Sequence, residues 1–144
     1  MQVVWFKRDL RVVDHEALAE SVRRGPVLPL YVLEPELWQQ TDLSRRQYQF
    51  LCDSLDSLNN SLRVLGQGLI IKVWDTVEIL NNIHARHTVQ ALWSHQETWN
   101  GWTYERDKRV QKWASENSKG SVASILSACP LFSEWIPANP SIQL

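Results

Sequence analysis

Short apolar runs alternate with amphipathic stretches along residues 3–113 of the chain. Each apolar run is continuous rather than alternating, which is typical of strands covered on both faces of a parallel sheet. These runs lie at 3–6, 27–33, 69–74 and 89–93. The pattern predicts a strand at each. Pro29 weakens the second unless it lies near the start of its strand or at a sheet edge.

Between the strands, apolar residues recur every three or four positions, which is the spacing of one face of a helix. The longest such stretch follows a capping box at 44–47 and ends at Gly66. Its apolar face consists of Tyr48, Leu51, Leu55, Leu58, Leu62 and Leu65. Cys52 lies beside this face, and we expect it to be buried. Cys129 is the only other cysteine.

Three further helices are expected. The first covers 15–24, with Asp14 as its N-cap and Ala17, Leu18, Ser21 and Val22 on its inner side. The second continues from Asp75 through His84. The last covers 102–113, where Trp102, Arg106, Val110 and Trp113 share a face, and where Glu105 and Arg109 have the spacing of an ion pair.

This order of elements predicts an α/β fold, a Rossmann-like doubly wound parallel sheet of about five strands with helices on both faces. Residues 1–117 form the expected domain, and the divergent tail, 118–144, offers 121–127 as a fifth strand. Ligands of such sheets bind beyond the carboxyl ends of the strands. The functional site is therefore expected in the loops 7–11, 34–38, 74–75 and 94–100.

Composition and charge limit the kinds of partner and the location that can be expected for the chain. The 144 residues carry a formal net charge of -1, so there is no global basic field and no direct DNA binding is expected. No apolar run is long enough to span a bilayer, and charges from Lys7 onward exclude a secretory leader. Two cysteines are too few for a disulfide framework, which favours a cytoplasmic location.

The loop after the first strand, Lys7 to Arg11, contains charges and no glycine. Glycines at this turn normally let backbone N–H groups approach a pyrophosphate, so their absence disfavours dinucleotide binding. The charges suit ion pairs that hold neighbouring loops or another domain. A solvated loop with weak local pairs is the simpler alternative.

No metal site is expected. His84 and His87 lie three residues apart, while His15 and His95 are isolated in the sequence, and no cysteine or carboxylate completes a ligand pattern around them. The sequence contains no nucleophile elbow and no phosphate loop, and neither cysteine has an activating histidine nearby.

Four ordered segments carry a family resemblance. "WFKRDLRVVDHEAL" resembles the N-terminal signature of the DNA photolyase and cryptochrome family. "LYVLEPELW", "DLSRRQYQFLCDSLDSL" and "ETWNGWTYERDKRVQKW" follow in the family's order and spacing. The resemblance covers residues 2 to about 117. The tail after Asn117 has no counterpart in the family, and the sequence does not distinguish a fragment from a short natural protein.

The resemblance implies a role as well as a fold. Members have an N-terminal α/β domain, which often holds an antenna pigment, a folate or a deazaflavin. A helical domain follows, binds FAD, and serves light-driven repair of pyrimidine dimers or blue-light sensing. This chain matches only the first part, so no FAD site is expected in it, no catalytic residue is assigned, and repair by the chain alone is not expected.

Family positions carried onto this sequence give two sets of residues. The pigment set is Leu33, Trp38, Ser44, Arg46, Gln96, Glu97 and Asn100. The set expected to tie the loops together and face the helical domain is Arg8, Asp9, Arg11, Arg106 and Asp107. Without a pigment, Trp38 would be a staple over the following helix and Glu97 an ordinary loop carboxylate.

Two other functions are compatible with the residues. A non-enzymatic interaction module would use the face left by the missing helical domain to bind a partner or a second copy of itself. A small-nucleotide-binding protein of the same architecture is disfavoured by the missing glycines.

Overall fold

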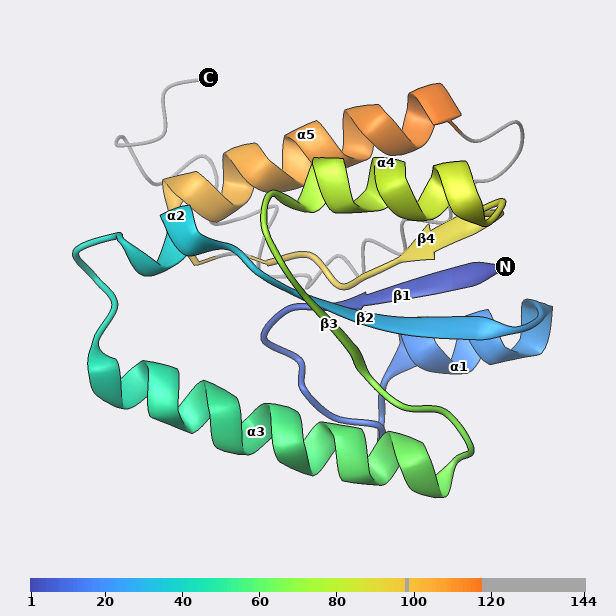
Figure 1. The fold of residues 1–144 in the computed structure, drawn as a ribbon, viewed down its shortest axis with the longest axis horizontal. Coiled ribbons are helices and arrows are strands. Elements are labelled where there is room, and N and C mark those ends of the chain that lie inside the picture. Colours follow the sequence, from blue (N-terminus) through green and yellow to red (C-terminus); the bar gives the residue numbers. More distant parts are fainter. Residues whose placement is uncertain (98, 118–144) are drawn as a thin grey trace, which may run out of the picture.

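The computed structural model describes residues 1–97 and 99–117. The chain runs β1 (Gln2–Phe6), α1 (Glu16–Arg24), β2 (Val27–Leu33), α2 (Pro35–Trp38), α3 (Arg45–Val64), β3 (Ile70–Val73), α4 (Thr76–Arg86), β4 (Ala91–Trp93) and α5 (Gly101–Asn117). The four strands form one parallel sheet in the order β3-β2-β1-β4 (Figure 1). The predicted α/β class and all four predicted strands are confirmed, with strand ends that differ by at most two residues. The candidate fifth strand at 121–127 lies outside the described residues.

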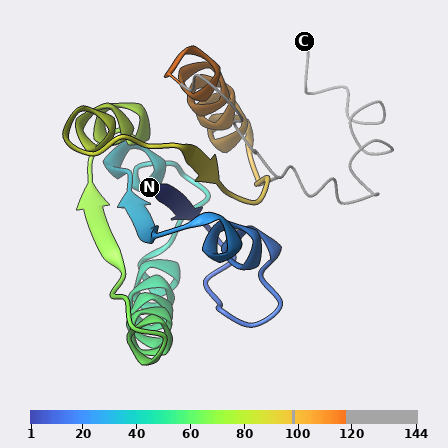
Figure 2. The ribbon, with the colours of Figure 1, turned by 90° about the vertical axis from the view of Figure 1, so that its right-hand side faces the viewer.

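Helices cover both faces of the sheet, α4 and α5 on one side and α1 and α3 on the other (Figure 2). Successive residues of β1 point to opposite faces, because the side-chain period of a strand is two. Val3 and Trp5 therefore pack with α4 and α5, whereas Val4 and Phe6 pack with α1 and α3. The continuous apolar run of β1 thus supplies two separate cores.

Pro29 occupies an internal strand, where a missing N–H usually costs a ladder hydrogen bond. It pairs in register with Val4 of β1. The pairing of β2 with β3 begins only at Leu30. Pro29 therefore precedes the stretch in which backbone N–H groups of β2 are needed to bond β3. Its position near the start of the strand explains why the proline is tolerated.

Local capping signals set most helix starts. The side chain of Ser44 accepts the backbone N–H of Gln47 at 3.3 Å, and the side chain of Gln47 accepts the backbone N–H of Ser44 at 2.6 Å, which confirms the capping box. Asp75 caps α4 as predicted, accepting the N–H of Val77 at 2.9 Å. Of the predicted apolar face of α3, Leu51, Leu55, Leu58 and Leu62 are buried, whereas Tyr48 and Leu65 at its two ends are exposed.

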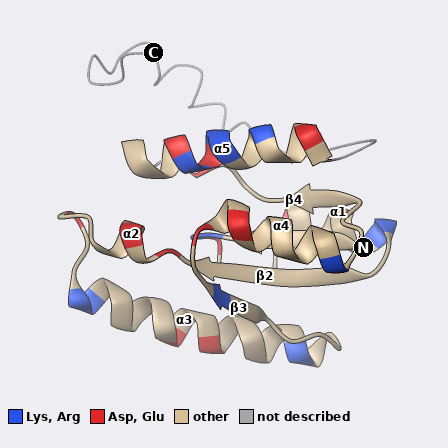
Figure 3. Cartoon of the chain, turned by 45° about the horizontal axis from the view of Figure 1, so that its top comes forward, with Lys and Arg blue, Asp and Glu red and all other residues tan. Residues whose placement is uncertain are grey.

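Several detailed predictions are wrong. His15 rather than Asp14 caps α1, because Asp14 has a positive φ of 53° that turns it out of the cap position. Val22 is 61% exposed and Cys52 is only half-buried. Arg109 does not pair with Glu105, because it reaches Asp75 at 2.9 Å across the interface with α4. Figure 3 shows that α5 carries acidic and basic positions together rather than a face of one sign.

None of the helices in the described part of the chain is both long and apolar enough to cross a lipid bilayer.

Candidate functional site

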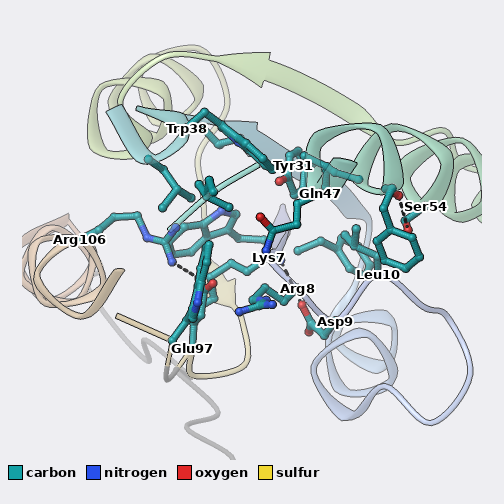
Figure 4. Close-up of a pocket in the computed structure, with 18 of the residues that line it drawn as sticks. Lys7, Arg8, Asp9, Leu10, Tyr31, Trp38, Gln47, Ser54, Glu97 and Arg106 are labelled. Carbon is teal, nitrogen blue, oxygen red and sulfur yellow. Dashed lines mark hydrogen bonds and ion pairs between the residues drawn. The ribbon is translucent and has the colours of Figure 1, made fainter. Parts of the chain in front are cut away.

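The carboxyl ends of the strands open onto a cavity of about 430 Å³. Its walls come from β1 and its following loop, the end of β2 with α2, the first half of α3 and the loop before α5. Figure 4 shows Trp38 and Tyr31 on one side of this main cavity, and Arg8, Asp9 and Glu97 on the opposite side. A volume of this size is typical of sites for small molecules.

One wall is aromatic and aliphatic. Trp5, Phe6, Tyr31, Trp38, Phe50 and Leu51 contribute to it. Trp38 packs edge-on against Tyr48 of α3, with ring centroids 5.2 Å apart. Its indole Nε1 is buried and has no hydrogen-bond partner among the described residues. A buried donor without an acceptor costs free energy, so it is suited to an acceptor atom on a ligand.

Tyr31 provides a second polar group among the apolar lining residues. Burial raises the pKa of its hydroxyl, and the nearby Glu97 carboxylate raises it further. The phenol therefore stays neutral throughout the physiological range and keeps its proton. Gln47 also lines the cavity, with its side-chain oxygen already committed to the cap of α3.

Arg106 of α5 organises the charged part of the lining. Its guanidinium is 2.8 Å from Glu34 of β2's carboxyl end, contacts Glu97 directly, and lies over the Trp5 ring at 4.9 Å. All three charged side chains are at least nine-tenths buried. Burial alone would lower the pKa of Arg106, but the carboxylates of Glu97 and Glu34 raise it overall. The arginine is therefore permanently charged.

For Glu34 and Lys7, in contrast to Arg106, burial decides the direction of the net pKa shift. Burial raises the pKa of Glu34 even though Arg106 opposes the shift, and Thr76 donates a hydrogen bond of 2.5 Å to its carboxylate. Burial also lowers the pKa of Lys7, whose ammonium lies 2.8 Å from Asp107. These pairs join the loop after β1, the end of β2 and α5 into one polar network beneath the cavity.

Asp9 brings together two histidines that are isolated in the sequence. Its Oδ2 lies 2.5 Å from His95 Nδ1 and 2.7 Å from His15 Nε2. Its Oδ1 accepts the backbone N–H of Lys7 at 3.0 Å. Burial would raise the pKa of Asp9, but its contacts with His15, the Lys7 N–H and His95 lower it well below its usual range. Asp9 is therefore an ionised carboxylate that links three segments.

The structure brings together part of the expected pigment set. Trp38 and Glu97 line the main cavity, and Gln96 lines a smaller one beside it. Leu33, Ser44, Arg46 and Asn100 are not among the residues that line either. Ser44 caps α3, and Asn100 caps α5 by accepting the N–H of Thr103 at 3.0 Å.

The residues expected to face another domain fall into two groups, one that lines the main cavity and one that is engaged within this domain. Arg8, Asp9 and Arg11 line the main cavity, with Arg8 and Arg11 exposed. Arg106 is buried within this domain and so serves its internal network, as does its neighbour Asp107.

Residue patterns alone did not identify the α3 contribution. Gln47, Phe50, Leu51 and Ser54 line the cavity. Leu51 belongs to the leucine face, while Gln47, Phe50 and Ser54 recur at steps of three and four and form a second helical stripe next to it. That stripe was the available signal. Trp99, which lines both cavities, gave no such signal because its loop has no periodicity.

Comparison with known proteins gives a consistent result. The family model described as DNA photolyase matches residues 2–128. The chain is 35% identical over 117 residues to deoxyribodipyrimidine photo-lyase of Salmonella typhimurium, covering 76% of this chain and 24% of the relative. It is 49% identical over 70 residues to cryptochrome-1 of Arabidopsis thaliana, covering 49% of this chain and 10% of the relative.

A solved structure agrees with the fold. The class III photolyase from Agrobacterium tumefaciens superposes with a TM-score of 0.71 and 28% identity, covering 81% of this chain and 24% of that protein. The chain thus spans at most about a quarter of the length of these relatives.

Proposed function

The chain belongs to the DNA photolyase family, and we propose that it is the family's antenna domain, holding a folate or deazaflavin pigment in the main cavity. The single observation that carries this proposal is the cavity itself. It lies at the carboxyl ends of parallel strands, has about 430 Å³ of space, and combines aromatic walls with a buried donor that has no partner among the described residues.

The chemistry of the walls fits a conjugated ring with a lactam edge, a feature that folates and deazaflavins share. The Trp38 N–H suits the carbonyl oxygen of such an edge. Glu97 lines the same cavity and provides a carboxylate, although one of its oxygens already binds Arg106. The flat faces of Trp38 and Tyr31 suit stacking on or against the ring.

The activity of a whole family member is a further step. Light-driven, FAD-dependent DNA repair or blue-light sensing would require a helical FAD-binding domain, and no FAD-site residues of the family map onto this chain. We propose that the exposed Arg8 and Arg11 are available to dock such a domain, and that the isolated chain does not repair DNA. The two-cysteine composition supports a reducing compartment such as the cytoplasm.

The test is direct binding. The purified chain is titrated with a deazaflavin and with a folate, and absorbance and tryptophan quenching are followed. We expect a 1:1 complex absorbing in the near-UV to violet, with a thermal midpoint that rises with ligand concentration. Trp38→Phe keeps an aromatic wall but removes the N–H, so the complex should weaken about two- to tenfold.

Trp74→Phe is the matched control, because Trp74 is 58% exposed and hydrogen-bonds Glu78 rather than lining the cavity. Binding by this variant should equal that of the wild type. A chain that binds neither pigment, or a Trp38 variant that binds as tightly as the wild type, contradicts the proposed site.

A further inference from the structure

Three side chains that line the main cavity carry hydrogen-bond donors with no acceptor among the described residues. The donors are the indole N–H of Trp38 in α2, the hydroxyl of Tyr31 in β2 and the side-chain amide nitrogen of Gln47 in α3. Figure 4 shows the three side chains on the side of the cavity away from Asp9 and Glu97. Because they come from three separate elements that meet at the cavity, one molecule bound there is placed to accept from all of them.

The donor character of these groups does not depend on a titration in the physiological range. An indole and a primary amide keep their N–H hydrogens at any such pH. Burial and the Glu97 carboxylate raise the pKa of Tyr31, so its phenol keeps the proton. The side-chain oxygen of Gln47 accepts the backbone N–H of Ser44 at 2.6 Å, which fixes the orientation of the amide and leaves its NH₂ group unpaired.

The carboxylates of the cavity lining do not face these donors. Asp9 and Glu97 are the two carboxylates among the lining residues that the structure describes, and both lie on the opposite side (Figure 4). Asp9 accepts the backbone N–H of Lys7 and contacts His95, while one oxygen of Glu97 binds Arg106. The side with the three donors therefore suits a ligand edge rich in acceptors. An amino group on that edge would set donor against donor.

The two pigment classes differ in the edge that they present. The terminal ring of a flavin or deazaflavin is a pyrimidine-2,4-dione, which has a carbonyl oxygen on either side of one ring N–H. A folate has a carbonyl on one side of that N–H and an amino group on the other. The Trp38 N–H suits the carbonyl that both classes have. Tyr31 and Gln47 then remain for the second carbonyl, and a folate would leave them facing an amino group, unpaired.

We propose that Tyr31 and Gln47 determine the specificity of the main cavity by donating to the second carbonyl oxygen of a pyrimidine-2,4-dione, so that its ligand is a flavin or deazaflavin ring rather than a folate. The inference rests on the proposed pigment site and narrows it to one of the two pigment classes. Both residues lie outside the pigment set that the family resemblance implies.

Lumazine and pterin form the matched probe pair, because they have the same fused pteridine ring and the same carbonyl at C4. Lumazine has a second carbonyl at C2 and a hydrogen on N1, whereas pterin has an amino group at C2 and no hydrogen on N1. Dissociation constants are measured on the full chain by tryptophan quenching, at a slightly acidic pH where both rings are neutral. We expect lumazine to bind about tenfold more tightly, since it pairs donors that pterin leaves unpaired. A deazaflavin and a folate give the same comparison with complete pigments.

Variants are judged by the ratio of the two dissociation constants, because a general effect on ring binding cancels in it. Tyr31→Phe removes only the hydroxyl and should reduce the preference for lumazine about threefold. Gln47→Glu keeps an acceptor for the Ser44 cap but presents a carboxylate to the cavity, which suits the amino group of pterin, so the preference should disappear or reverse. Trp38→Phe removes the donor to the shared carbonyl and should weaken both probes with the ratio unchanged.

Gln49→Glu is the matched control for the added charge. Gln49 is on the same helix, donates to Asp53 at 3.1 Å and is not among the residues that line the main cavity. Its ratio should equal that of the wild type. A ratio for Gln47→Glu that does not differ from the ratio for Gln49→Glu would show that Gln47 does not contact the second carbonyl.

The outcomes separate this inference from the proposed function. Equal binding of lumazine and pterin, or a folate bound as tightly as a deazaflavin, overturns the specificity assignment while the pigment site stands. Binding of neither complete pigment removes both. A lumazine preference that survives Tyr31→Phe and Gln47→Glu alike means that other groups recognise the second carbonyl, and the assignment is then wrong.

Discussion

Replacing Arg106 by Met tests the polar network beneath the cavity most severely. The arginine side chain is 4% exposed and contacts Glu34 and Glu97, whose side chains are 3% and 6% exposed. Methionine fills much of the same volume but removes the positive charge. Two buried carboxylates would then lack their principal counter-charge, and Lys7, already bound to Asp107, does not replace it.

The expected cost is about 3–5 kcal/mol in the free energy of unfolding, the range for removing one partner from a buried ion pair. A domain of this size has about 5–15 kcal/mol in total, so the variant should be far closer to unfolding. Urea denaturation at pH 7, followed by tryptophan fluorescence, measures the loss. The deficit should shrink toward pH 5, because burial raises the pKa of Glu34 and its protonation removes one of the two unpaired charges.

Arg109→Met is the matched control on the same helix. Arg109 is 51% exposed in its pair with Asp75, so its loss should cost less than about 1 kcal/mol. If Arg106→Met does not fold, the double variant with Glu34→Gln should recover part of the stability, because the two sites are coupled. A loss at Arg106 no larger than that at Arg109 would refute the reasoning.

Two other substitutions probe separate parts of the domain. The lowered pKa of Asp9 means that its contribution to stability is present above its unfolded value of about 4 and is lost as pH falls. Wild type should therefore lose more stability than Asp9→Asn between pH 5 and pH 3 in thermal melts, and parallel profiles would contradict the shift. Leu58→Ala removes a 2% exposed side chain from the core between α3 and the sheet. It should lower the free energy of unfolding by about 2–5 kcal/mol in urea titrations, whereas a loss below about 1 kcal/mol would indicate a loosely packed core.

Helix periodicity, capping patterns and apolar runs predicted those features that depend on residues close together in the sequence. The leucine stripe of α3 follows from a period that any helix imposes on its buried face, and the caps at Ser44 and Asp75 involve residues two or three positions apart. The apolar runs likewise predicted the strands, since a strand buried on both sides needs apolar residues at every position. The α1 cap failed because the backbone at Asp14 adopts a positive φ, which the residue types around it did not reveal.

Only the tertiary structure decided the site. The sheet order places β1 beside β4, so Asp9 meets His95 across 86 positions of sequence. In the sequence, Arg106 is one polar residue on a predicted amphipathic helix. The packing of α5 over the sheet buries it between Glu34 and Glu97. Helix and strand periods are fixed by backbone geometry within a few residues. Charge pairing and cavity shape depend instead on which distant segments the sheet brings together, and that information is in the packing.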